Sequence, residues 1–210
     1  MIYELYTEAN FWESKTMNSA SFVCGYCGER VNSDQGMRLG YLRAGSLYHP
    51  RETGVYICTS CNLPTFIGDT KEGERIQVPG INFGDPVTNL PENVNDIYEE
   101  ARSSFSVEAY TGVILLCRTL LDHLAVSLGA EPNQSFQAYI DYLQNNHYVT
   151  GPSAKWADAI RTFGNKATHR LVINTKDQAE LIIKFCEMIL KSNYEYPALY
   201  DRMQNSENKE

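Results

Sequence analysis

The sequence predicts a mainly α fold in which an antiparallel helical bundle follows a small β-rich unit. Apolar residues recur at helical spacing over most of the chain beyond residue 92, and short connections separate the helical segments. Two C-x-x-C motifs lie in the first third of the chain, and each follows a short segment typical of a strand. These patterns divide the chain into an N-terminal β-rich unit over 1–80, a linker over 81–92, a helical region over 93–198 and a polar tail over 199–210.

Composition narrows the class of protein. A length of 210 residues suits one full domain with a small one, and a hydrophobic fraction of 43% is enough for a packed core. The longest unbroken apolar run is Val113 to Cys117, far shorter than the roughly 18 residues of a membrane span. The N-terminus has no signal-peptide pattern, so we expect a cytoplasmic protein. A net charge of −8 argues against a protein that coats nucleic acid, although a local basic site is compatible with it.

The four cysteines of the two C-x-x-C motifs predict a metal site. Cys24 and Cys27 form the first pair, and Cys58 and Cys61 form the second. Four thiolates in two such pairs satisfy tetrahedral zinc, whereas a single redox C-x-x-C would leave the second pair unexplained. A reducing compartment disfavours the alternative of two disulfides. The sequence therefore predicts a structural Zn²⁺ held in a zinc ribbon, with every coordination position filled by protein.

Five helices are predicted beyond the linker. Leucine and valine side chains form one stripe on the second helix, and Gly129 ends it. Thr175 and Gln178 have the spacing of a capping box at the start of the fifth helix. The predicted helices cover residues 92–105, 107–129, 135–146, 153–169 and 175–193.

The fourth predicted helix contains the stretch RTFGNKATHR. On a helix, Arg161, Asn165 and His169 fall at i, i+4 and i+8, and together they form a polar ridge nearly opposite the helix's apolar stripe. The surrounding segment over 155–176 carries five basic residues and one acidic residue. This segment is a candidate anion-binding site, and a solvated helix face is the alternative. Its basic residues are Lys155, Arg161, Lys166, Arg170 and Lys176.

The second predicted helix places Arg118 four residues before Asp122. A local ion pair explains this spacing and contributes about 0.2–0.5 kcal/mol. In the functional interpretation, Arg118 instead meets the ridge of Asn165 and His169, either within one chain or across a dimer.

Residues 90–195 resemble an uncharacterised branch of the HEPN superfamily that is associated with restriction and other prokaryotic defence modules. The most specific piece is R-x-x-G-N-x-x-x-H, which here is Arg161, Gly164, Asn165 and His169. Many HEPN proteins are dimeric, metal-independent ribonucleases, and others are non-catalytic binding modules. In the superfamily signature four to six residues separate the arginine from the histidine. Seven separate Arg161 from His169, and four separate Arg118 from His123.

The resemblance implies two alternative functions. As a metal-independent endoribonuclease of a defence or toxin-type system, the chain would form a homodimer and cleave RNA. His169 would then act as acid and base, Arg161 and Arg118 would hold phosphate, and Asn165 would orient these groups. As a non-catalytic adaptor, the chain would bind a protein partner or nucleic acid. In either case the expected nucleic-acid contacts are Lys155, Lys166 and Arg170.

Overall fold

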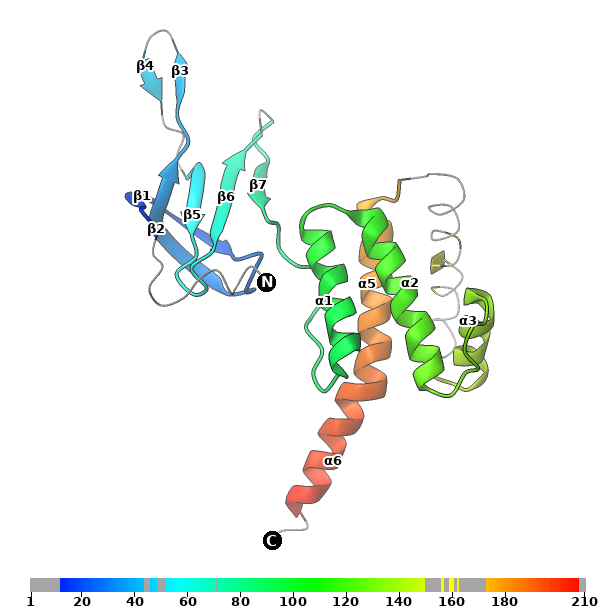
Figure 1. Cartoon of the computed structure of the whole chain (residues 1–210). Coiled ribbons are helices and arrows are strands. Elements are labelled where there is room, and N and C mark those ends of the chain that lie inside the picture. The colour runs from blue at the N-terminus through cyan, green and yellow to red at the C-terminus, as the bar shows by residue number, and fades with distance from the viewer. Residues whose placement is uncertain are drawn as a thin grey trace. The chain divides into compact units, whose positions relative to one another are not determined.

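The computed structural model of the protein describes residues 12–43, 46–48, 52–70, 72–149, 156, 159–160, 162 and 173–207. The chain divides into two compact units, Met1–Ile81 and Asn82–Glu210. In the described part of the chain, the first unit is built from strands and the second from helices (Figure 1).

A five-stranded antiparallel sheet forms the first unit, with the strand order β1-β2-β5-β6-β7. Strands β3 and β4 pair separately as a two-stranded hairpin inserted between β2 and β5. The sheet is therefore a meander, because each of its strands pairs with the next sheet strand along the chain. The strands are β1 Lys15–Val23, β2 Arg30–Arg38, β3 Tyr41–Arg43, β4 Ser46–Tyr48, β5 Gly54–Ile57, β6 Pro64–Asp69 and β7 Arg75–Val78.

The meander brings the two C-x-x-C motifs to the same end of the sheet. Antiparallel strands reverse direction at every turn, so the turn between β1 and β2 lies at the same end as the turn between β5 and β6. The first turn contains Cys24 and Cys27, and the second contains Cys58 and Cys61. The strand order alone therefore makes the two pairs neighbours.

A small hydrophobic core lies beneath the two cysteine turns. Tyr56 on β5 is fully buried, and its hydroxyl donates a hydrogen bond to the carbonyl oxygen of Asn18 at 3.1 Å. Burial raises the pKa of this hydroxyl. The other buried members of the core are Met17, Ala20, Phe22, Cys24, Val31, Cys58 and Ile67.

The second unit packs its helices around α2. Helix α2 contacts α1, α3 and α5, and Figure 1 shows it with α5 on one side and α3 on the other. Its apolar side chains supply much of the core because they recur at helical spacing on the faces that meet these neighbours. The elements are α1 Glu92–Ser106, α2 Tyr110–Ser127, α3 Phe136–Asn145, α5 Lys176–Leu190, η3 Lys191–Glu195 and α6 Tyr196–Glu207.

Local signals set several helix ends. The capping box predicted for Thr175 and Gln178 is confirmed, since the side chain of each bonds the backbone N–H of the other. Ser135 caps α3 by accepting a hydrogen bond from the N–H of Ala138. Helix α2 begins later than predicted because Glu108 adopts a left-handed conformation with φ of 63°.

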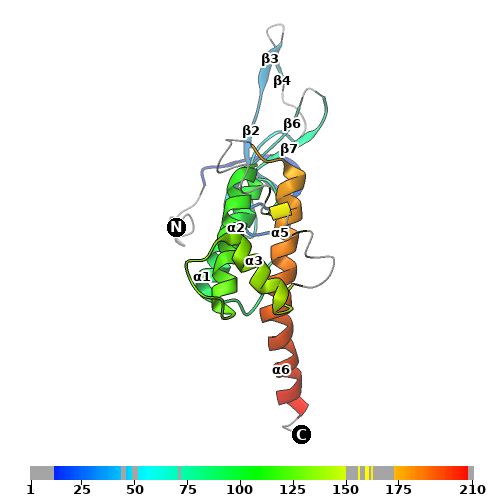
Figure 2. The same cartoon turned by 90° about the vertical axis from the view of Figure 1, so that its right-hand side faces the viewer.

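Helices α5 and α6 join through the π-helical turn η3 into one long helix. Pro197 has no backbone N–H to donate, so a regular α-helical bond is missing at this point. The preceding N–H of Tyr196 donates to the carbonyl oxygen of Lys191, five residues back, and helical winding continues. Both views show α6 extending beyond the ends of the other helices of this unit (Figures 1 and 2).

Residues 82–90 are bound to α1 rather than free of it, although the sequence reads as a linker. The guanidinium of Arg102 donates to the carbonyl oxygen of Gly84 at 2.8 Å, and the hydroxyl of Tyr98 donates to that of Asp85 at 2.9 Å. Backbone carbonyl groups of this segment, which is rich in Gly and Pro, thus accept hydrogen bonds from side chains of the neighbouring helix α1.

The same segment is tied to α5 by a half-buried charge cluster. The carboxylate of Glu187 accepts from the N–H of Asp85 at 3.0 Å and from the ammonium groups of Lys184 and Lys191 at 2.8 and 2.9 Å. Lys191 also pairs with the Asp85 carboxylate at 3.0 Å. Although burial raises the pKa of Glu187, the hydrogen bonds from Lys184 and the Asp85 N–H outweigh burial and hold that pKa below its ordinary value.

The prediction of a mainly α chain built on an antiparallel helical bundle was wrong. A five-stranded antiparallel sheet occupies the N-terminal unit, where only a small ribbon was expected. In the described part of the second unit, four helices precede the C-terminal helix α6, and this arrangement is not clearly a bundle. The β-rich N-terminal region itself agrees with the structure. Among the described residues, no helix is both long and apolar enough to cross a membrane.

Candidate metal centre

The two cysteine turns have the same backbone geometry. In residues 24–29 and 58–63, the first cysteine donates its N–H to the carbonyl oxygen five residues on, and the N–H four residues on donates back to its carbonyl oxygen, all at 2.9 Å. The N–H two residues on points at the sulfur of the first cysteine at 3.4 Å in both turns. Each turn is therefore held in its metal-binding shape by the backbone as well as by any bound ion.

The fifth residue of each turn is left-handed, a feature that the spacing of the cysteines did not reveal. Gly28 has φ of 74° and Asn62 has φ of 60°. Glycine and asparagine are the residues that tolerate this conformation best. Their common position, four residues after the first cysteine of each pair, is a sequence signal that could have predicted the shared turn.

Gly25 allows another part of the chain to approach the first turn. A Cβ atom at this position would clash with the carbonyl oxygen of Gly80 and lie 2.7 Å from that of Pro79. The backbone that follows β7 therefore passes directly against the first cysteine pair. The side chain of Gln77 adds to this contact by donating to the carbonyl oxygens of Val23 and Pro79.

The four sulfur atoms converge on one point. The Sγ atoms of Cys24 and Cys61 are 3.7 Å apart, and those of Cys27 and Cys58 are 3.8 Å apart. All four lie within 4.8 Å of one another. These separations are far longer than a disulfide bond of about 2.05 Å, and all four cysteines are free thiols. The predicted cysteines thus form a cluster that could hold a metal ion.

Electrostatics differ among the four thiols. Burial raises the pKa of Cys24, and it also raises that of Cys61. At Cys58 burial acts in the same direction, but the N–H groups of Cys61 and Ser60 outweigh it and lower the pKa. A bound cation deprotonates coordinating thiols, so it would overcome the effect of burial at Cys24 and Cys61.

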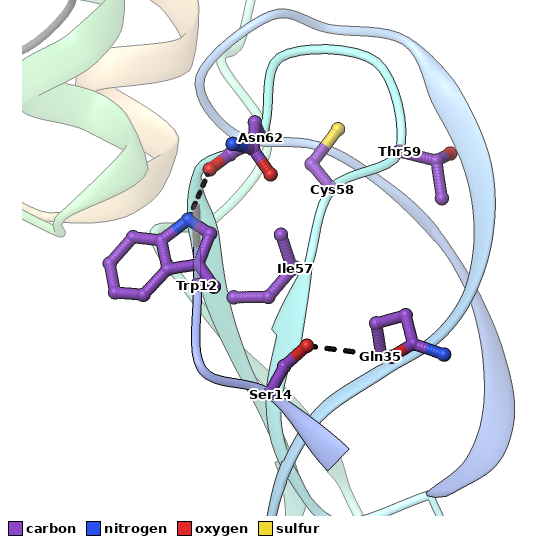
Figure 3. Close-up of a pocket in the computed structure, with 7 residues that line it drawn as sticks. All are labelled: Trp12, Ser14, Gln35, Ile57, Cys58, Thr59 and Asn62. Carbon is purple, nitrogen blue, oxygen red and sulfur yellow. Dashed lines mark hydrogen bonds between the residues drawn. The ribbon is translucent and has the colours of Figure 1, made fainter. Parts of the chain in front are cut away.

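A pocket of about 360 Å³ lies beside the second cysteine turn (Figure 3). The indole N–H of Trp12 donates to the carbonyl oxygen of Asn62 at 2.7 Å, which holds the ring at the edge of the pocket. Ser14 and Gln35 are hydrogen-bonded on the opposite side. The pocket is thus built on the second cysteine turn, and its remaining lining residues are Ile57, Cys58 and Thr59.

Arg118 packs within the helical unit. Its guanidinium carbon lies 4.5 Å from the centre of the Phe136 ring, a cation–π contact between α2 and α3. Asp122, one turn later, is half-buried, and its Oδ1 has no hydrogen-bond partner among the described residues. Burial raises the pKa of Asp122 to about 6, although the positive charge of Arg118 acts in the opposite direction.

Most of the predicted helical site lies outside the described residues. Arg118 is the one member that lies in a described part of the chain. His123, on the same helix, lies 3.2 Å from the side-chain amide of Asn93 through its Nε2 atom. The predicted residues outside the described ranges are Lys155, Arg161, Asn165, Lys166, His169 and Arg170.

Comparison with protein families identifies the C-terminal part. A family model described as "Domain of unknown function (DUF4145)" matches residues 99–206. The chain belongs to the DUF4145 family. No solved structure matches it. The DUF4145 match begins within α1 and ends within α6, so it contains Arg118 and the whole 155–176 segment. The four metal-site cysteines precede the DUF4145 match and belong to the N-terminal sheet.

Proposed function

We propose that this chain is a zinc-stabilised binding module whose N-terminal sheet is held by a structural Zn²⁺ and whose helical unit binds RNA or another nucleic acid. The observation that carries the zinc assignment is the convergence of the four sulfurs. Tetrahedral zinc with Zn–S bonds of about 2.3 Å places its sulfurs about 3.8 Å apart. The separations of 3.7 and 3.8 Å agree with that geometry.

The zinc site supports binding rather than chemistry. Four protein thiolates complete the tetrahedron and leave no coordination position for water or substrate. The N–H groups of Tyr26 and Ser60 further stabilise the thiolates, as expected of a permanent site. The ion would hold together two turns that are distant in sequence.

The zinc assignment is tested by metal analysis of the purified protein. We expect about one zinc per chain in the parent and a large loss in Cys24→Ser. Cys117→Ser is the matched control, because Cys117 is a buried thiol of the other unit and should leave the zinc content unchanged. A parent protein with much less than one zinc per chain contradicts the assignment.

Nucleic-acid binding is supported by the basic 155–176 segment and by the resemblance to HEPN proteins. Within this segment Lys176 is described, and its side chain is 61% exposed at the start of α5. A concentrated set of basic residues on an otherwise acidic chain provides a local site for phosphates. Arg118, the other arginine expected to hold phosphate, lies against the ring of Phe136 on α3.

The binding proposal is tested with the purified protein and single-stranded RNA. We expect binding that weakens with salt and is reduced in Lys166→Glu with Arg170→Glu. The matched control is Lys15→Glu with Arg30→Glu, a pair of exposed basic residues on the other unit. Equal RNA affinity in both double variants contradicts the proposed location.

Metal-independent ribonuclease activity is a second candidate, favoured by the R-x-x-G-N-x-x-x-H motif. His169 would remove the proton from a ribose 2′-hydroxyl, and Arg161 would stabilise the charged phosphate, in a homodimer of a prokaryotic defence or toxin-type system. Incubation with total RNA and tRNA in EDTA tests this candidate. Cleavage that disappears in His169→Asn but persists in His147→Asn supports the ribonuclease, and RNA binding without cleavage supports the non-catalytic module.

A further inference from the structure

Helix α6 carries an exposed apolar stripe at helical spacing. Tyr196, Leu199 and Tyr200 are 55%, 50% and 62% exposed, and Met203 continues the stripe. The spacing i, i+3, i+4 and i+7 places the four side chains on one face of the helix. Together they expose on the order of 400 Å² of mostly apolar surface, which is the size of the largest apolar patch on a typical monomer, and such patches are often functional.

Among the described residues of the second unit, Tyr196, Leu199 and Tyr200 remain at least half exposed. Both views show α6 extending past α1, α2 and α3, and its main contacts are with the preceding turn η3 (Figures 1 and 2). Among the side chains described in α6, residues 196–205, none is buried and only Ala198 is half-buried. The stripe falls inside the DUF4145 match, which extends to residue 206. Helix α6 is therefore part of the domain and not an added tail.

The polar side of α6 excludes two classes of partner. Asp201 and Asn205 lie opposite the stripe, and Arg202 is the single basic residue of positions 196–205. Helices that bind anionic membrane surfaces carry several Lys or Arg residues on the polar face. Binding to nucleic acid likewise needs a basic surface. A helix of this charge fits another protein helix.

The charges beside the stripe match an identical helix in the antiparallel direction. Glu195 and Arg202 are seven residues apart and lie on the same flank of the stripe. When two such helices run antiparallel with Tyr196 of one against Leu199 of the other, Glu195 of each chain lies beside the other chain's Arg202. The same contact is then made twice around a two-fold axis.

We propose that α6 is a self-association surface on which two copies of this chain pair antiparallel through Tyr196, Leu199 and Tyr200. The proposal does not depend on nucleic-acid binding, because self-association is measured without nucleic acid. The small apolar area indicates a weak, reversible dimer.

The main test is sedimentation velocity of the full chain between about 1 and 300 μM. We expect a concentration-dependent monomer–dimer equilibrium in the parent, and a dissociation constant raised at least tenfold in Leu199→Asp. Asn205→Asp is the matched control, because it adds the same charge to the opposite face of the same helix and should leave the dimer intact. A parent that stays monomeric over this range, or equal weakening by both variants, overturns the proposal.

A charge exchange tests the antiparallel register. Arg202→Glu alone should weaken self-association, because it places two acidic residues together at both ends of the contact. Mixing Arg202→Glu with Glu195→Lys should restore pairing as a heterodimer, since opposite charges then meet at both ends. Glu195 also accepts hydrogen bonds from Thr88, so the thermal unfolding of Glu195→Lys is compared with that of the parent. Two monomers in a mixture of folded variants overturn the antiparallel pairing.

Two further measurements distinguish a second copy of the chain from other partners that could cover the stripe. Hydrogen exchange at low concentration reports whether α6 is already covered in the monomer. Slow exchange there would mean that another part of the same chain covers the stripe, which overturns the proposal. Binding of α6 to phosphatidylcholine vesicles, lost in Leu199→Asp, would identify a lipid surface as the occupant and would also overturn it.

Discussion

The Sγ atoms of Cys24 and Cys61 lie 3.7 Å apart although the two residues are 37 positions apart in the chain. The meander creates this proximity, because it places the β1–β2 turn beside the β5–β6 turn. Four thiols at these distances contribute little to the free energy of folding when no cation lies between them. Four thiolates that coordinate one ion bind it strongly, and that binding energy stabilises the fold. The metal centre and the sheet should therefore depend on each other.

Removing the metal should unfold the N-terminal unit selectively. Each unit contains one of the two tryptophans, with Trp12 bonded to the second cysteine turn and Trp156 near Phe185. In Trp156→Phe the remaining fluorescence reports on the metal-binding unit, and in Trp12→Phe it reports on the helical unit. We expect a strong chelator to shift the emission of the first variant towards that of unfolded protein and to leave the second unchanged. Equal shifts in both variants would mean that the two units unfold together.

Gly84→Ala should destabilise the helical unit more than left-handed strain alone explains. Gly84 has φ of 80°, and a Cβ atom there would lie 2.6 Å from Cγ2 of Ile183. Strain and overlap together should reduce the free energy of unfolding by about 2–4 kcal/mol. Gly73→Ala is the control, because Gly73 is also left-handed but has no atom within 4 Å of the added Cβ. In Gly73→Ala the free energy of unfolding of the N-terminal unit should fall by about 1 kcal/mol.

Glu187→Gln should weaken the attachment of residues 82–90 to α5. The glutamine can still accept from the Asp85 N–H, but the charge pairs with Lys184 and Lys191 are lost. We expect a loss of about 2 kcal/mol at pH 7, measured by urea unfolding.

The effect of Glu187 should depend on pH in a defined direction. The folded state lowers its pKa, so its contribution is complete above the unfolded-state value of about 4.3 and is lost as the pH falls below that value. The difference between Glu187→Gln and the parent should therefore shrink in acid. Glu180→Gln on the same helix is the control, because its distance of 3.9 Å from Lys176 indicates a weak surface pair worth less than about 0.5 kcal/mol.

Asp122→Asn should stabilise the protein at neutral pH. The folded state raises the pKa of Asp122 to about 6, above an unfolded value of about 3.9, so folded protein binds the proton more tightly. The free energy of unfolding should consequently fall as the pH rises from about 4 to about 6. In Asp122→Asn this part of the pH dependence should disappear. A shift of this size corresponds to about 3 kcal/mol, and screening of the half-buried carboxyl by water reduces the expected gain to about 1 kcal/mol. Asp96→Asn, an exposed position on α1, should leave the slope unchanged.

The cluster of four cysteines was predictable because the spacing of C-x-x-C pairs is a local signal. Two C-x-x-C pairs identify four sulfurs without any knowledge of the sheet. The capping box of Thr175 and Gln178 was predictable for the same reason, since all its groups lie within one helical turn.

The extent of the sheet was not predictable, because β2 reads RVNSDQGMR and lacks a clear apolar alternation. Its buried positions include Ser33 and Gly36, which bury little apolar surface, so tertiary pairing with β1 and β5 defines the strand. Helix α6 was missed because the polar residues after Tyr200 suggested a tail, and the π-helical turn before Pro197 continues the helical winding into this segment. Residues 82–90 are attached through their backbone carbonyl oxygens. Every residue has such an oxygen, so the sequence does not indicate which ones accept a hydrogen bond.

The placement of the four ligands in two separate turns also affects synthesis of the protein on the ribosome. A nascent chain that ends between β2 and β5 carries only Cys24 and Cys27, so it can form the first hairpin but cannot complete a tetrahedral site. The final sulfur becomes available when residue 61 leaves the exit tunnel. A bound ion would therefore gain its last two ligands only after the second turn has emerged, and a product truncated before that turn would offer the ion two thiolates.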